Sequence, residues 1–180
     1  MSCPNWASEY NREVPAHGTE RIMGPEKLTP EVHDWLVTNG WSPGRDIGER
    51  ADELIRVRVQ DSQRQGIPLT PAPVAVHTVH TYGLLRLAHP TTQGVSWVMN
   101  PTIGYEGDAR GIQELASGLG VDLFPIGYES SEYGILLIDE KGRFFHLHHT
   151  GGYYLGETAA DAFSRFLIGA PDLDAEDFFV

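Results

Sequence analysis

The chain has 180 residues, of which 41% are hydrophobic, and its 13 Lys and Arg against 25 Asp and Glu give a formal net charge of −12. This length and apolar content suit a single domain with a sizeable core. The negative charge argues against direct binding to nucleic acid or to an anionic membrane, since both attract basic surfaces.

The ends of the chain differ from its middle. Residues 1–26 mix Pro, Gly and charged residues without periodicity and include the single cysteine, Cys3. We therefore expect an N-terminal extension over 1–26, one domain over 27–170 and an acidic, solvated C-terminal tail over 171–180. Neither a secretory signal pattern nor a run of about 18 apolar residues occurs, so we expect a cytoplasmic location.

Helices dominate the first half of the domain. The segment "LTPEVHDWLVTNG" has Thr29 as N-cap and Pro30 at the first helical position, which predicts a helix that ends near Gly40. A second helix is predicted within 47–66, with Arg58 on its polar side. After Pro73 the pattern fits either a strand or a short helix, and we favour the helix.

The stretch "NGWSPGR" joins the first two helices. Its glycines and proline specify a tight turn, from which Trp41 and Arg45 project. We expect Trp41 to be a core anchor and Arg45 to bond backbone carbonyls or a carboxylate. Direct contact of these side chains with a partner is the alternative.

Strand patterns appear in the second half. "GLLRLAH" and "GVSWVMNP" are predicted as adjacent strands, and a helix is predicted from Asp108 as N-cap to Gly120. Two apolar runs around "DEKG" indicate a β-hairpin, and a last helix is predicted before Gly169. The predicted fold class is α+β, with helices packed on an antiparallel sheet.

Patterns typical of catalysis or metal binding are weak. His77 and His80 are spaced i, i+3, and His146 and His148 share one strand face, but neither pair has a carboxylate or cysteine in a known ligand pattern. Ordinary imidazoles at a sheet edge explain the second pair. No nucleophile elbow and no phosphate-binding loop occurs. We therefore predict no enzyme activity, no cofactor and no metal.

Several segments in order resemble the third group of the SUKH superfamily, bacterial immunity proteins of polymorphic toxin systems. They span Leu28 to Gly169 and read "GWSPGRDI", "YGLLRL", "VMNPT", "GVDLFPIGYES", "LLIDEKGRFFHL" and "YYLGETAADAFSRFLIG". The residues that we regard as the structural motif are Trp41, Gly44, Arg45, Pro125, Gly127 and Gly142.

The resemblance implies a single SUKH-like domain, with helices on a curved antiparallel sheet, that neutralises a cognate toxin by binding it. A SUKH-type adaptor for another cellular protein, and a small His-metal hydrolase, are the alternatives. Positions 101–180 hold 4 basic and 14 acidic residues, which favours a basic toxin such as a basic nuclease. The expected contact residues, in loops around the sheet and nearby, are Glu106, Asp108, Tyr128, Glu129, Glu132, Tyr133, Tyr153 and Tyr154.

Overall fold

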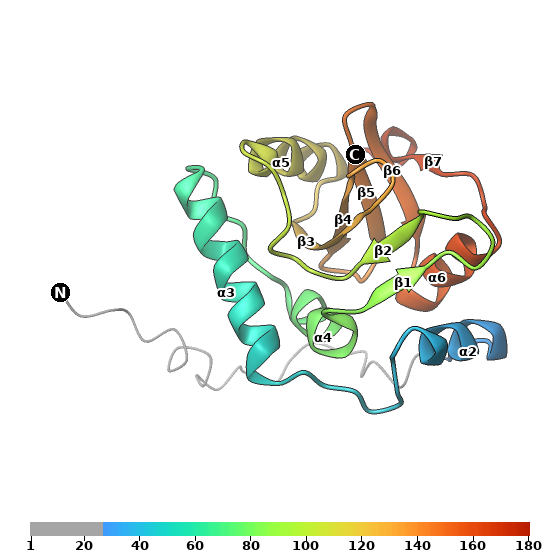
Figure 1. Cartoon of the computed structure of the whole chain (residues 1–180). Helices are drawn as coiled ribbons and strands as arrows, with labels where there is room; N and C mark the ends of the chain where they lie inside the picture. Colours follow the sequence, from blue (N-terminus) through green and yellow to red (C-terminus); the bar gives the residue numbers. More distant parts are fainter. Residues whose placement is uncertain (1–26) are drawn as a thin grey trace, which may run out of the picture.

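The computed structural model describes residues 27–180, which form α-helices and one antiparallel sheet (Figure 1). This confirms the predicted α+β class. The predicted extension 1–26 lies outside the described residues. The α-helices are α2 (Pro30–Thr38), α3 (Glu49–Arg64), α4 (Pro73–Tyr82), α5 (Asp108–Leu119) and α6 (Ala159–Leu167).

The sheet is a meander in which each strand pairs antiparallel with the next in the chain. The sequence patterns predicted four of its seven strands and missed β3, β6 and β7. The strands are β1 (Arg86–Ala88), β2 (Ser96–Val98), β3 (Leu123–Glu129), β4 (Ile135–Asp139), β5 (Phe144–His148), β6 (Gly151–Gly156) and β7 (Leu173–Asp174).

Local sequence explains where several of these elements begin and turn. The Thr29 hydroxyl accepts a hydrogen bond from the Val32 amide (3.3 Å), as expected of an N-cap. In the β4–β5 hairpin the Asp139 carboxylate accepts from the amides of Lys141 and Arg143, both at 2.9 Å. Gly142 has φ +92° there, a conformation that favours glycine.

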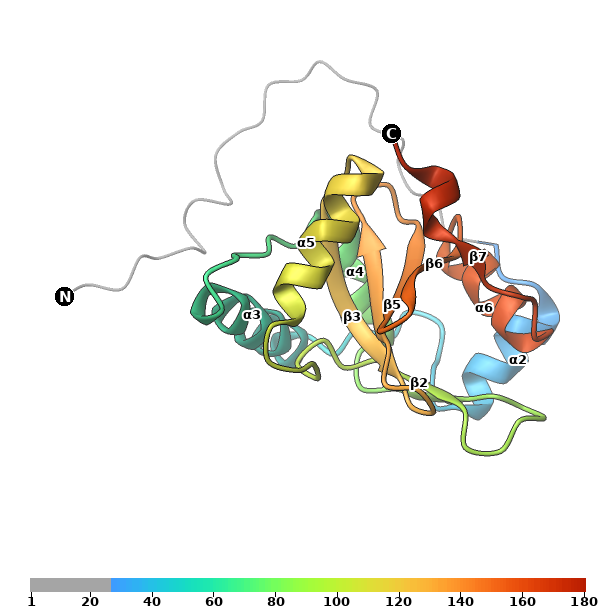
Figure 2. The same ribbon diagram turned by 90° about the horizontal axis from the view of Figure 1, so that it is seen from above.

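Helices cover both faces of the sheet, with α5 on one face and α6 on the other (Figure 2). The α6 face carries an aromatic core in which the Phe163 ring lies 5.1 Å from Tyr82 and 6.1 Å from Phe144. On the opposite face, Leu147 of β5 lies against Gly111 of α5. The two faces therefore present different surroundings to side chains that alternate along one strand.

The "NGWSPGR" segment fixes the connection from α2 to α3. Arg45 donates to the carbonyls of Thr81 and Gly83, both at 2.8 Å, so it ties the turn to the end of α4. Trp41 is half-buried rather than fully buried, and it packs against the core. Gly44 has φ +75°, so this turn requires a residue that tolerates the left-handed region.

The prediction that Arg58 lies on the polar side of its helix is wrong. Its side chain is 1% exposed and donates to Asp108 at the start of α5 (2.9 Å), which is 0% exposed. Asp108 also accepts from Gln65 (3.0 Å). Asp108 is therefore a buried link between α3 and α5, and not the exposed loop residue that we expected.

The C-terminal residues also differ from the expected solvated tail. Residues 173 and 174 form β7, which pairs with β6. The 3-10 helix η1 (Ala175–Phe178) follows, and the Phe178 ring stacks on Tyr154 with 4.4 Å between centroids. Ala175 is fully buried. This acidic segment is part of the packed domain because its apolar residues cover the end of the sheet.

Candidate functional site

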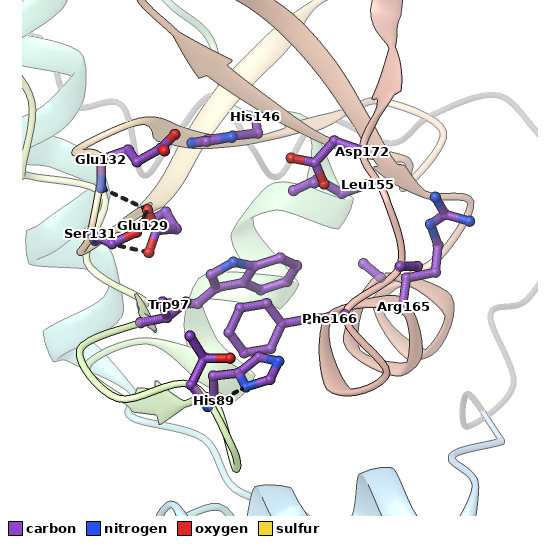
Figure 3. A pocket seen from close by; sticks show the side chains of 15 residues that line it. His89, Trp97, Glu129, Ser131, Glu132, His146, Leu155, Arg165, Phe166 and Asp172 are labelled. Carbon is purple, nitrogen blue, oxygen red and sulfur yellow. Dashed lines mark hydrogen bonds between the residues drawn. The ribbon is translucent and has the colours of Figure 1, made fainter.

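A cavity of about 320 Å³ opens between α6 and the sheet (Figure 3). Its walls come from the β1–β2 loop, the β3–β4 turn, strands β2, β5 and β6, helix α6 and the segment that leads into β7. The lining residues are His89, Thr92, Val95, Trp97, Glu129, Ser131, Glu132, His146, Leu155, Ala162, Arg165, Phe166, Gly169, Ala170 and Asp172.

Strand register explains why residues distant in sequence meet on this face. Trp97 of β2 is aligned with Glu129 of β3, and His146 of β5 is aligned with Leu136 of β4 and Tyr153 of β6. Aligned residues of antiparallel strands project from the same face. The Glu129 amide bonds the Gly134 carbonyl at 2.8 Å, which continues the same row.

His146 is the most buried titratable residue of the cavity. It is 6% exposed and its Nε2 atom has no hydrogen-bond partner. The ring lies against Gly134, where any Cβ atom would overlap Nε2. Burial lowers the pKa of His146, against the opposing effects of Asp172 and Glu129, so the ring is neutral at neutral pH.

The location of His146 corrects one expectation from the sequence. Strand β5 lies between β4 and β6, so His146 is not at a sheet edge. The side chain of His148, two residues further on, is 9% exposed, and its Nε2 is 3.6 Å from the exposed Glu132 carboxylate. The two imidazoles share a face, as the alternation predicted, but their surroundings differ.

Glu129 organises the turn that forms one wall of the cavity. Its carboxylate accepts from the Ser131 amide (2.9 Å), the Ser131 hydroxyl (2.8 Å) and the Glu132 amide (2.9 Å). It is 8% exposed. The expectation that Glu129 is an exposed loop residue is therefore wrong, since its hydrogen bonds hold it beneath the turn, where it positions the exposed Glu132.

Asp172 contributes a carboxylate from the opposite wall (Figure 3). Burial raises its pKa, against the opposing effects of His146 and Arg165. Within residues 27–180 no hydrogen bond to its carboxylate is found. The Arg165 guanidinium lines the same cavity but donates to the Pro171 carbonyl at 3.0 Å. The cavity thus contains three acidic groups and one guanidinium.

The remaining wall is aromatic. The Phe166 ring lies 4.6 Å from Trp97 and 5.0 Å from His89, measured between centroids. Trp97 is 3% exposed and belongs to the core, so this wall is held by the packing of the domain. The cavity is amphipathic, with rings on one side and carboxylates on the other.

The predicted contact residues do not form one surface. Glu132 lines the cavity and Tyr153 shares its face of the sheet, whereas Tyr128 and Tyr154 are aligned with residues of the α5 face. Tyr154 is buried and donates to Glu157 (3.1 Å), and burial together with this bond raises its pKa to about 12. Exposed Glu106 precedes α5, and Tyr133 is 74% exposed in the β3–β4 turn.

His89, Trp97, Arg165 and Asp172 were missed as residues of a common site. Only long-range pairing brings them together, and no local spacing reveals it. The one available signal was the alternation in "GVSWVMNP", which predicts that Trp97 faces the core.

His80, of the pair His77 and His80, makes two carboxylate contacts. His80 Nδ1 lies 2.7 Å from Asp46 and Nε2 lies 3.1 Å from Asp52, so the ring links two carboxylates at the start of α3. Burial disfavours the charge on this ring, but the two carboxylates outweigh it and the pKa of His80 is raised.

Within residues 27–180 no group of three potential ligands is arranged to hold a metal ion. No helix in the same range is long and apolar enough to cross a membrane.

The fold and the cavity define an α+β domain with an amphipathic, acidic recess on one face of a meander sheet. The sequence model of the SUKH-3 immunity protein family matches residues 28–169, and the chain belongs to this family. The resemblance inferred from the sequence is thereby confirmed, and the membership supports an immunity function. The searches of curated proteins and of solved structures found no match.

Proposed function

We propose that this protein neutralises a cognate toxin by binding it directly, and that the surface around the cavity is the binding face. Membership in an immunity protein family supports the general role. The single observation that carries the choice of face is the recess, in which carboxylates lie opposite an aromatic wall. Binding sites are typically concave and combine apolar walls with a few polar groups.

The charge of the chain supports a basic toxin. Of the four basic residues in positions 101–180, Arg143 is engaged by Asp139 (2.6 Å) and Arg165 by Pro171. Glu132 is 63% exposed at the rim of the cavity. An acidic rim increases the association rate with a basic partner and makes that rate fall as salt is added.

The area that a specific complex buries requires contacts beyond the cavity. Such a complex buries about 1,600 Å² in total, which is far more than the cavity provides. The half-buried Tyr153 shares the cavity face of the sheet, and tyrosine is enriched in interfaces. The exposed Tyr133 ring instead stacks on Tyr128 of the α5 face, with 6.4 Å between centroids. We therefore place the cavity at the centre of the interface and Tyr153 beside it.

Coexpression tests the proposal. The toxin domain encoded beside this protein should kill a host cell when produced alone and be tolerated when this protein is present. Glu132→Lys should weaken protection and slow association, whereas Glu114→Lys is the control because Glu114 is exposed on α5, on the opposite face.

The outcomes distinguish an error in the proposed immunity role from an error in the assigned binding face. If no neighbouring toxin is neutralised, the immunity role is wrong for those toxins, and copurification of an unrelated cellular protein would favour the adaptor alternative. If protection occurs but both lysine variants behave alike, the binding face is misplaced.

A further inference from the structure

The cavity has the size and the polarity of a receptor for one side chain. A water molecule occupies about 30 Å³ in the liquid, so about 320 Å³ accommodates on the order of ten waters or a long side chain. Its rings line one side, and its carboxylates lie at the other (Figure 3). A long cationic side chain has the same division, with a hydrocarbon stem and a charged head.

The acidic groups of the cavity meet few cationic groups of the described chain, and the nearest to Glu132 is His148, whose Nε2 atom lies 3.6 Å from its carboxylate. Arg165 is the one Lys or Arg that lines it, and its Nη2 atom already donates to Pro171. His146, at the back of the cavity, is 6% exposed and has an unpartnered Nε2 atom, and burial disfavours its protonation. A buried imidazole nitrogen without a hydrogen-bond partner and the exposed carboxylates of Glu132 and Asp172 therefore line the same space.

Two of the three carboxylates are available to a guest. Glu129 is committed to the β3–β4 turn through three hydrogen bonds, so it contributes charge but not a free acceptor. Glu132 lies on the turn, and Asp172 comes from the segment before β7 on the opposite wall. A guest cation between them would meet an acceptor on each side.

We propose that the cavity receives one arginine or lysine side chain of the toxin, with its charged head between Glu132 and Asp172. The stem lies against the rings of Trp97 and Phe166, and the aromatic faces also attract the cation. This inference rests on the proposed function, because it names the group by which the toxin is recognised. Such a side chain, buried at the centre of an interface, is typical of a binding hot spot.

A small-molecule titration tests the cavity without the toxin. Blocked arginine and blocked lysine, with acetyl and methylamide ends, are added to the full chain at low salt while the imidazole resonances of His146 are followed by NMR. Blocked citrulline, which is neutral and nearly isosteric with arginine, is the control ligand. We expect weak, saturable binding of at least one cationic probe, shifts at His146, and no saturable response to citrulline.

A charge-neutral double variant tests which carboxylates act. Glu132→Gln combined with Asp172→Asn should weaken binding of the cationic probe by about tenfold or more, the effect of losing a charge-assisted hydrogen bond. The matched control combines Glu114→Gln with Asp122→Asn, which removes one Glu and one Asp charge at exposed positions outside the cavity lining. Its effect should be below twofold.

The results separate this inference from the proposed function. If citrulline binds as well as the cationic probes, or if the two double variants weaken binding equally, the cavity is not a cation receptor. If the toxin is bound and the cavity variant binds it as tightly as the control variant does, the inference fails while the immunity function stands. If the probes bind as expected but no toxin is neutralised, the function fails, and the cavity recognises a cationic group from another source.

Discussion

The buried pair of Arg58 and Asp108 allows a quantitative prediction about stability. Asp108→Ala leaves a guanidinium that is 1% exposed without its buried partner, and it removes the acceptor for Gln65 Nε2 and the Tyr105 amide. Breaking a buried ion pair by removing one partner destabilises by about 3–5 kcal/mol. We expect that loss in the free energy of unfolding of Asp108→Ala.

Urea unfolding at neutral pH measures this effect, and a thermal scan checks it. For a chain of this size about 1 kcal/mol corresponds to about 2–4 °C, so the midpoint should fall by about 10 °C. Asp61→Ala is the control, because Asp61 contacts Arg58 at 3.1 Å but its side chain is 36% exposed. Asp61→Ala leaves the bond from Arg58 to Asp108 in place, so the control should lose clearly less free energy of unfolding than Asp108→Ala.

A double variant separates charge burial from packing. Arg58→Met with Asp108→Leu removes both charges while keeping apolar volume, and such replacements of buried pairs are often neutral or stabilising. The double variant should therefore be more stable than Asp108→Ala. If Asp108→Ala loses less than about 1 kcal/mol, the pair does not hold α3 against α5, and the reasoning from burial is refuted.

Three further predictions concern single residues. The folded state raises the pKa of His80, so its two carboxylate contacts stabilise the fold fully below about pH 6.5. This stabilisation is lost as the pH rises through the pKa of His80 in the folded state. The free energies of unfolding of His80→Gln and of the parent chain should therefore become equal at high pH. Trp41→Ala should lower the free energy of unfolding by about 2 kcal/mol, less than a fully buried tryptophan, and an unchanged melting temperature would contradict its anchoring role. Gly134→Ala should displace the His146 ring, seen as changed imidazole resonances, and an unaltered spectrum would show that the ring does not pack there.

Sequence patterns predicted the elements whose ends are marked locally. Thr29 and Pro30 specify the start of α2, and the hairpin around Gly142 has its turn residues in the chain itself. Strand β3 was missed because "LFPIGYE" contains Pro125 and Gly127, which usually interrupt strands. In the structure a β-bulge between these two residues absorbs the irregularity, and Gly127 packs closely on the backbone of β2.

Strand β6 was missed for a related reason. "GGYYLG" contains three glycines, which weaken a strand, yet Gly152 leaves space for Leu115 of α5 and Gly156 lies against the backbone of Ala162. Both glycines serve helix packing on opposite faces of the sheet. Such requirements depend on partners far away in the chain, so composition within the segment cannot reveal them.

The candidate site was predictable only in part, and Arg58 and Asp172 show why. Arg58 follows Leu54 and Ile55 at helical spacing and so lies on the buried face of α3, but its charge led us to assign it to the polar side. Asp108 at the start of α5 is its buried partner. The acidic composition of residues 171–180 suggests solvent, but pairing of β7 with β6 brings Asp172 to the cavity. In both cases contacts with residues distant in the sequence determine where the side chain lies, whereas its charge alone suggested exposure to solvent.

Under the proposed function, stability and recognition depend on different parts of the cavity. Trp97 and His146 belong to the packed sheet, so changing them alters the fold as well as the recess. Glu132 and Asp172 lie on a turn and a connecting segment, and the three hydrogen bonds to Glu129 hold that turn whatever side chain position 132 carries. We therefore expect substitutions at these two carboxylates to change the charge and shape of the rim while the free energy of unfolding stays nearly constant. Urea unfolding of the same variants checks this, and a loss of affinity without a loss of stability then arises from the rim itself.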